Sequence, residues 1–168
     1  MSVFQLNDQA PDFKLTGLDR KEYHLADMLE QNDEKWLLLI YFRGSWCPAC
    51  MEELDELEDT ISYFNKHNIS LLTITHDEKT ALEKMQKEHQ FSFPVLLDED
   101  FSFLKAYDVY YHGEDAPYED HGEHAEPAYF LLNEKGKVLY QQRQTNPFGR
   151  PHAKELRKTI QYIRKNLK

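Results

Sequence analysis

The sequence is poor in cysteine and has no long apolar run, and each deficit excludes a class of protein. Two cysteines are too few for a disulfide-rich scaffold. The longest apolar run, from Trp36 to Phe42, falls far short of the roughly 20 residues of a membrane-spanning helix. The first residues lack a basic segment followed by an apolar one, so no secretory signal is expected. We therefore expect a cytoplasmic protein without a membrane partner.

Basic residues are also scarce. The chain has 20 Lys and Arg against 30 Asp and Glu, which gives a net charge of −10. Such a charge excludes nucleic acid as the main partner, because phosphate binding requires a basic surface. A length of 168 residues with 40% hydrophobic residues suits one globular domain, 1–168.

Apolar periodicity predicts strands that alternate with helices, followed by a hairpin and a last helix. We expect strands over 36–42, 69–75, 93–97, 128–132 and 137–141, and helices over about 48–66, after Asp77, over 101–107 and over 152–167. Residues 108–126 lack periodicity and are predicted to be irregular. This order specifies an α/β fold, a mixed sheet with helices on both faces.

The two cysteines stand three positions apart in Cys47-Pro48-Ala49-Cys50, directly after a predicted buried strand. Thiol–disulfide exchange needs a thiolate that attacks a sulfur and a second thiol that resolves the mixed disulfide. Pro48 suits the first turn of a helix, and a helix N-terminus favours a thiolate on the first cysteine. We predict Cys47 as the exposed nucleophile and Cys50 as the resolving thiol.

The residues beside the pair allow more than one interpretation. Arg43 either favours the Cys47 thiolate or is a surface arginine paired with a carboxylate, and Trp46 either shapes the site or only packs beside it. Glu52 and Glu53 oppose the thiolate, but water screens exposed charges. Cys-x-x-Cys is also half of a zinc site, which would then need histidine ligands. The strand before the pair and the helix after it favour redox chemistry without a cofactor.

The segment 42–50, Phe-Arg-Gly-Ser-Trp-Cys-Pro-Ala-Cys, resembles the thioredoxin superfamily, nearest to the AhpC/TSA (redoxin) branch and its peroxiredoxin-like members. Segments 10–13, 93–98 and 106–109 are similar to other parts of that branch. The resemblance implies a thioredoxin-like three-layer α/β/α sandwich with an N-terminal redoxin extension. It also places Pro127 where thioredoxins have a cis-proline that lines the substrate groove.

The sequence departs from peroxiredoxins at the residues that bind peroxide. Their Pro-x-x-x-Thr-x-x-Cys pattern aligns the peroxide-reactive cysteine with Cys50, and then Arg43 replaces the proline and Cys47 the threonine. The family's activating arginine falls near Pro127. These departures favour dithiol exchange over efficient peroxide reduction. The alternative is an antioxidant enzyme that reduces peroxide through Cys50, with Cys47 resolving.

The partners that the resemblance implies are a disulfide-containing protein, a small thiol or a peroxide as substrate. The electron donor would be thioredoxin or a low-molecular-weight thiol. Tyr41 occupies the place of the buried acid that thioredoxin uses as a proton relay, so the sequence leaves the base for Cys50 unidentified.

Residues 112–126 form an acidic insertion with three histidines and six carboxylates that leads directly into Pro127. The first interpretation is a solvated loop. A second assigns the loop to substrate selection or proton transfer, with His124 as a base. A third is metal binding, because thioredoxin-fold copper chaperones use two cysteines and a loop histidine, here Cys47 and Cys50 with His121 or His124.

Overall fold

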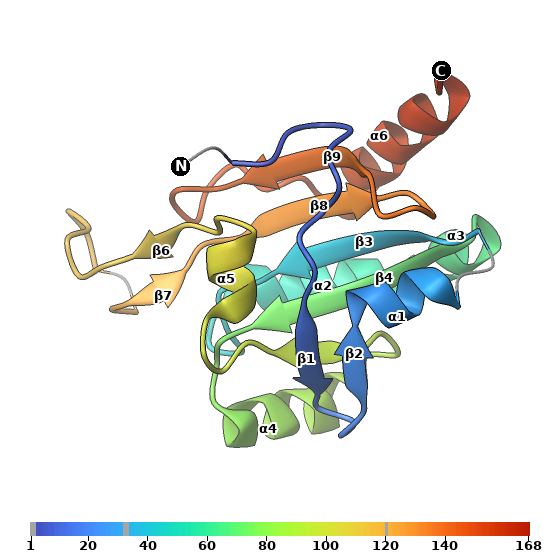
Figure 1. The fold of residues 1–168 in the computed structure, drawn as a ribbon. Coiled ribbons are helices and arrows are strands. Elements are labelled where there is room, and N and C mark those ends of the chain that lie inside the picture. The colour runs from blue at the N-terminus through green and yellow to red at the C-terminus, as the bar shows by residue number, and fades with distance from the viewer. Residues whose placement is uncertain (1–2, 32–33, 120) are drawn as a thin grey trace.

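A seven-stranded mixed sheet forms the centre of the computed structural model, which describes residues 3–31, 34–119 and 121–168 (Figure 1). Its strands are β1 (Lys14–Gly17), β2 (Glu22–His24), β3 (Trp36–Tyr41), β4 (Ile69–Thr75), β5 (Val95–Leu97), β8 (Ala128–Leu132) and β9 (Val138–Arg143). They lie in the order β2-β1-β5-β4-β3-β8-β9. β3 is an interior strand, parallel to β4 and antiparallel to β8.

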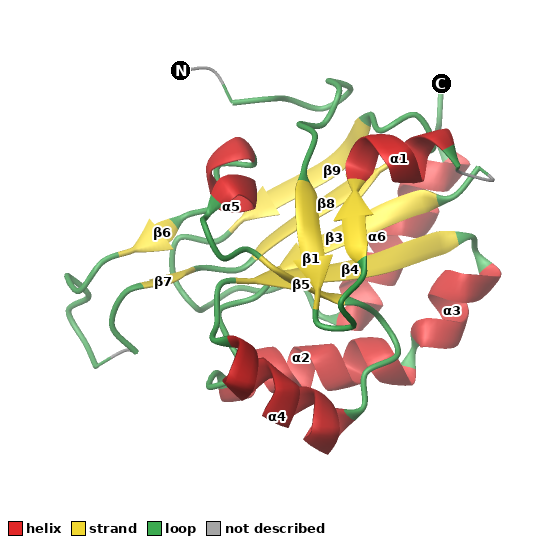
Figure 2. Ribbon diagram, turned by 60° about the horizontal axis from the view of Figure 1, so that its bottom comes forward, coloured by secondary structure: helices red, strands yellow, loops and turns green. Residues whose placement is uncertain are grey.

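Helices cover both faces of this sheet. They are α1 (Leu25–Glu30), α2 (Pro48–Asp59), α3 (Ile61–Lys66), α4 (Lys79–His89), α5 (Ser102–Ala106) and α6 (Ala153–Lys165). Leu38 and Ile40 of β3 pack in the core that includes α2, α4 and α6, whereas Leu39 and Tyr41 pack in the core that includes α1 and α5. Figure 2 shows α2, α3 and α4 on one side of the sheet and α1 and α5 on the other. The predicted three-layer α/β/α architecture is confirmed.

The parallel pairing of β3 and β4 positions the cysteine loop, residues 42–47, because parallel strands end at the same edge of the sheet. β3 ends at Tyr41, the cysteine loop follows, and α2 begins at Pro48. Asp77, which follows β4, accepts hydrogen bonds from the backbone N–H (2.8 Å) and the hydroxyl of Ser45. Asp77 therefore anchors the cysteine loop. It does not cap α4 as expected, since the N-cap of that helix is Glu78.

The helix predicted over 48–66 is divided at Thr60 into α2 and α3. The Thr60 hydroxyl donates to the carbonyl oxygens of Glu56 (3.0 Å) and Leu57 (3.2 Å). A side chain that bonds to the preceding turn competes with the helical hydrogen-bond pattern, which accounts for the break. No helix within the described residues is both long enough and apolar enough to cross a membrane.

The insertion 112–126 is more ordered than expected at its ends. A separate two-stranded ribbon pairs β6 (Tyr111–His112) with β7 (His124–Ala125) and extends beyond the main sheet (Figure 1). His112 and His124 are buried, so the expectation of a solvated loop is wrong at these ends. Strand pairing satisfies the backbone groups there and turns His124 inward. Asp120, one of the six carboxylates, lies outside the described residues.

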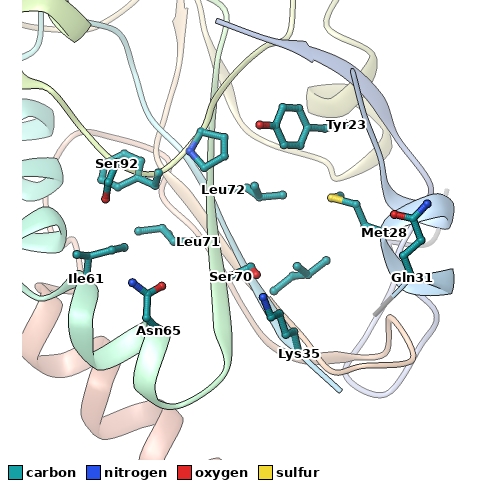
Figure 3. A pocket seen from close by; sticks show the side chains of 13 residues that line it. Tyr23, Met28, Gln31, Lys35, Ile61, Asn65, Ser70, Leu71, Leu72 and Ser92 are labelled. Carbon is teal, nitrogen blue, oxygen red and sulfur yellow. The ribbon is translucent and has the colours of Figure 1, made fainter. Parts of the chain in front are cut away.

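A hollow of about 490 Å³ lies at the end of β3 opposite to the cysteines (Figure 3). Its lining includes Lys35, which precedes β3, together with Ser70 and Leu72 of β4. Because the cysteine loop follows β3, this hollow is separated from the dithiol by the length of the strand.

Candidate active site

The dithiol is built at the N-terminus of α2. Cys47 is the N-cap residue, and its Sγ accepts a hydrogen bond from the backbone N–H of Cys50 at 3.2 Å. Pro48 follows in the first turn and is exposed, where its missing N–H leaves no gap in the helical pattern. Both cysteines are free thiols. The sequence-based placement of the pair at a helix start is confirmed.

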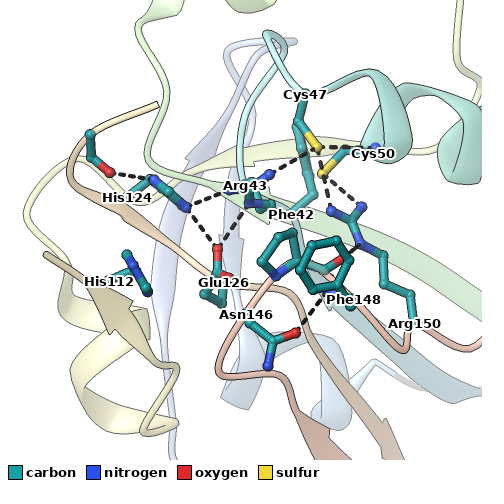
Figure 4. A network of polar contacts seen from close by, with 12 residues as sticks. Phe42, Arg43, Cys47, Cys50, His112, His124, Glu126, Asn146, Phe148 and Arg150 are labelled. Atoms are coloured by element: carbon teal, nitrogen blue, oxygen red, sulfur yellow. Dashed lines mark hydrogen bonds and ion pairs between the residues drawn. The ribbon is translucent and has the colours of Figure 1, made fainter. Parts of the chain in front are cut away.

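Both sulfurs are covered, which corrects the expectation of an exposed nucleophile. Cys47 is 1% exposed and Cys50 is 0% exposed. Arg150, in the loop between β9 and α6, extends its guanidinium over the pair (Figure 4). Its Nη1 lies 3.0 Å from Cys50 Sγ and its Nη2 lies 3.4 Å from Cys47 Sγ.

The two thiols differ in acidity. The hydrogen bond from the Cys50 thiol lowers the pKa of Cys47 far below its usual value, and Arg150 and the Cys50 backbone N–H lower it further against the effect of burial. Burial raises the pKa of Cys50, as does the neighbouring Cys47, while Arg150 opposes this rise. The pair therefore holds one thiolate, on Cys47, and one thiol, on Cys50.

Arg43 combines the two roles that the sequence left open. Its Nε donates to Glu126 Oε1 at 2.9 Å, and both side chains are buried. Its Nη1 also donates to Cys47 Sγ at 3.7 Å (Figure 4). Arg43 is thus not a surface residue. It is paired with a carboxylate and at the same time contributes positive charge beside the nucleophile.

His124 lies in the same network. Its Nδ1 donates to the Gly122 carbonyl at 2.6 Å, and its Nε2 lies 2.8 Å from Arg43 Nη2. The same Nε2 lies 2.7 Å from Glu126 Oε1. This geometry supports a role in positioning Arg43, and the role of His124 as a base stays a prediction.

Trp46 covers the network from the side of the insertion. Its indole stacks on His121 with a centroid distance of 3.8 Å, and Arg43 lies 4.9 Å from the indole centroid. The indole folds back over Gly44, where a Cβ atom would collide with the ring. Gly44 is therefore required by close approach, and Trp46 is part of the site's wall.

Pro127 does not have the geometry that the resemblance implies, because no peptide bond in the described part of the chain is cis. Its carbonyl accepts from the Gln144 backbone N–H (2.9 Å), and the Glu126 N–H donates to the Tyr110 carbonyl (2.8 Å). These bonds hold a trans path that directs the Glu126 side chain to Arg43. The expectation of a cis-proline is wrong, and Pro127 is buried at the start of β8.

Glu53 is a buried acid that sequence reasoning assigned to the solvent face. It lies one helical turn after Cys50, is 5% exposed, and accepts a hydrogen bond from the Tyr129 hydroxyl at 2.7 Å. Burial raises its pKa to about 7. The sequence could have shown that Glu53 is buried, because the residue fits the spacing of one buried helical stripe. That stripe consists of Cys50, Glu53, Leu54 and Leu57. The site thus contains a buried acid on α2, although Tyr41 stands where thioredoxin has its buried acid.

Arg150 was also missed. It is 100 positions from Cys50, and no spacing rule connects the two. Locally the sequence shows only turn-forming residues around it, Pro147, Gly149 and Pro151. Together with Glu53 it lines a cavity of about 320 Å³ beside the start of α2. The buried acid is thus next to an open cavity.

The arrangement disfavours a metal ion. Within the described residues, no three or more His, Cys, Asp and Glu side chains are grouped as metal ligands. The guanidinium groups of Arg43 and Arg150 both contact the sulfurs, and their positive charge repels a cation. The dithiol is suited to exchange of electrons and protons with another sulfur.

Comparisons with known proteins agree with this chemistry. The chain is 28% identical over 131 residues to the thiol-disulfide oxidoreductase ResA of Bacillus subtilis. The aligned region covers 77% of this chain and 63% of that protein. The chain thus spans less than two thirds of the length of this relative.

Solved structures show the same fold. AhpC of Mycobacterium tuberculosis superposes with a TM-score of 0.78 at 16% identity, covering 99% of this chain and 97% of that one. Peroxidoxin BcpB of the same organism has a TM-score of 0.75 at 18% identity, with 97% and 98% covered. The profile of the AhpC/TSA family matches residues 6–141. The chain therefore belongs to the AhpC/TSA family.

Proposed function

We propose that this protein is a thiol–disulfide oxidoreductase that cycles between a Cys47/Cys50 dithiol and a Cys47–Cys50 disulfide. One observation carries the proposal: two sulfurs share a helix start and one guanidinium. This setting lowers the pKa of Cys47 and not that of Cys50. The name of its relative ResA, a thiol-disulfide oxidoreductase, supports the same activity.

The exchange proceeds in two displacements. The Cys47 thiolate attacks one sulfur of a substrate disulfide, forms a mixed disulfide and releases the other substrate sulfur as a thiolate. Cys50 then loses its proton and attacks Cys47 Sγ, which releases the second substrate thiolate. The substrate disulfide gains two electrons, and the protein's dithiol is oxidised to a disulfide.

Glu53 is suited to accept the Cys50 proton. It follows Cys50 by one turn on the same buried stripe, and its pKa of about 7 suits a group that exchanges protons near neutrality. The cavity beside Glu53 provides a route for that proton to solvent.

The substrate class we propose is a disulfide in a protein or a small molecule, with thioredoxin or a low-molecular-weight thiol as donor. Antioxidant peroxide reduction through Cys50 is a second candidate, supported by the likeness to peroxidoxin and AhpC structures. The raised pKa of Cys50 disfavours it, since peroxide attack needs a thiolate. The cytoplasmic location expected from the sequence stays a prediction.

The two candidates are separated by comparing wild type with Cys47→Ser, Cys50→Ser and the double variant as a blank. We expect insulin-disulfide reduction that requires both cysteines, and slow peroxide consumption with a dithiol donor. Fast peroxide turnover that survives in Cys47→Ser would contradict the proposal and favour the peroxidase.

A further inference from the structure

Arg150 is placed to contact both reacting sulfurs at once. Its Nη1 contacts Cys50 Sγ at 3.0 Å and its Nη2 contacts Cys47 Sγ at 3.4 Å. Its Nε donates to the Pro147 carbonyl at 3.1 Å, which fixes the plane of the guanidinium (Figure 4). A planar group with several donors can hold two acceptors in a way that an ammonium cannot.

We propose that Arg150 is a catalytic residue that stabilises the two thiolates in turn, first on Cys47 for attack and then on Cys50 for resolution. The inference rests on the proposed function, because it assigns one side chain to both steps of that exchange.

In the first step a substrate must reach a sulfur that is only 1% exposed. The longer of the two contacts, from Nη2 to Cys47, is the one that the substrate displaces. Gly149, beside Arg150, has a φ of +78°, and Phe148 is 66% exposed. This loop can therefore yield on the Cys47 side without unpacking a buried side chain.

In the second step the negative charge moves to Cys50. Formation of the mixed disulfide removes the Cys47 charge and the hydrogen bond that oppose ionisation of Cys50. The shorter contact, from Nη1, is already at Cys50 Sγ. The proton leaves to Glu53, and the Cys50 thiolate, paired with Arg150, displaces the substrate sulfur from Cys47. No external oxidant is needed beyond the substrate disulfide.

The disulfide 4,4′-dithiodipyridine tests this assignment, because it is neutral and so has no charge that Arg150 could bind. Wild type should release one thiopyridone on Cys47 attack and a second on Cys50 attack, and Cys50→Ser should release only the first. The second phase is intramolecular, so its rate is independent of reagent concentration and reports resolution alone.

In Arg150→Gln we expect the second phase to slow by about tenfold or more, with its pH profile displaced to higher pH, because one pKa unit corresponds to a tenfold change. Arg150→Lys should recover part of the rate, since it keeps the charge but not the second contact. Arg157→Gln is the matched control. The Arg157 guanidinium, on α6, lies over the Tyr63 ring of α3, so this variant should behave as wild type.

A second phase with unchanged rate and pH profile in folded Arg150→Gln would overturn the inference while leaving the oxidoreductase intact. If Arg150→Gln does not fold by circular dichroism, the same comparison is made with Arg150→Lys, and an unchanged second phase there has the same meaning. A wild type that releases only one thiopyridone would instead defeat the proposed function itself.

Discussion

Arg43 and Glu126 form a buried ion pair, with 2.9 Å between Nε and Oε1 and side-chain exposures of 7% and 0%. The pair joins the loop that precedes Cys47 to the segment that enters β8. Because Arg43 also contacts the Cys47 sulfur, the position of the nucleophile depends on Glu126, which is 83 positions from Arg43 in the sequence. The acidic insertion is in this way part of the active site.

Replacement of Glu126 by Gln should destabilise the fold strongly. Removing one partner of a buried ion pair leaves an uncompensated charge, at a cost of about 3 kcal/mol in the free energy of unfolding. Urea denaturation measures this cost. Glu114→Gln is the control, because Glu114 lies in the same insertion but is exposed. Equal stability of the two variants would contradict the role assigned to the pair.

Gly44→Ala should also be destabilising, for a steric reason. The added Cβ would collide with the Trp46 indole, and overpacking of this kind costs about 1–3 kcal/mol. We expect a lower melting temperature and altered Trp fluorescence. Gly113→Ala is the control with the same substitution, because the nearest atom to its Cβ would be 3.7 Å away. It should leave the melting temperature and the Trp fluorescence unchanged.

The acidity of Cys47 should depend on the side chain at position 50. The Cys50 thiol donates to the Cys47 thiolate and is the largest cause of its lowered pKa. Cys50→Ala removes this donor and should raise the pKa of Cys47, whereas Cys50→Ser keeps a donor and should raise it less. Iodoacetamide alkylation across pH provides the measurement. A pKa of Cys47 near the free-thiol value of about 8.5 in wild type would contradict the assignment of the nucleophile.

Glu53 should make stability fall as the pH rises. Its pKa is about 7 in the folded protein against 4.5 for an ordinary glutamate, so the folded state retains the proton over a range where the unfolded state has lost it. The corresponding stability is complete below pH 4.5 and is lost as the pH rises through 7, by about 3 kcal/mol in total.

Glu53→Gln has no proton to lose there. Between pH 5 and pH 8 the variant should therefore gain stability relative to wild type, as followed by urea denaturation at each pH. Glu52→Gln, at the exposed neighbouring position, should keep the wild-type pH dependence. If the Glu53→Gln curve ran parallel to that of wild type, Glu53 would not carry the raised pKa.

Much of the fold followed from local patterns. The apolar run at 36–42 predicts a buried strand, and β3 is buried along its whole length. The stripe of α2 and the Cys-Pro-Ala-Cys spacing together located the dithiol at a helix start. These features depend on neighbours within one or two turns, which is the range over which periodicity is informative.

The errors arose where long-range contacts outweigh local preference. The β6–β7 ribbon has no apolar alternation, and its burial depends on His124 meeting Arg43. The trans path at Pro127 is set by backbone bonds to Tyr110 and Gln144. These partners are all distant in the sequence, so neither the burial of the ribbon nor the trans path could be inferred from spacing.

The sequence by itself determined that two sulfurs stand at the start of an amphipathic helix after a buried strand, because helical spacing and strand burial are local properties of the chain. Only the tertiary structure decided which charges meet those sulfurs. Arg150 and Glu126 reach the site from distant loops through packing of the whole sheet, and electrostatic control of a thiol depends on distance in space and on burial.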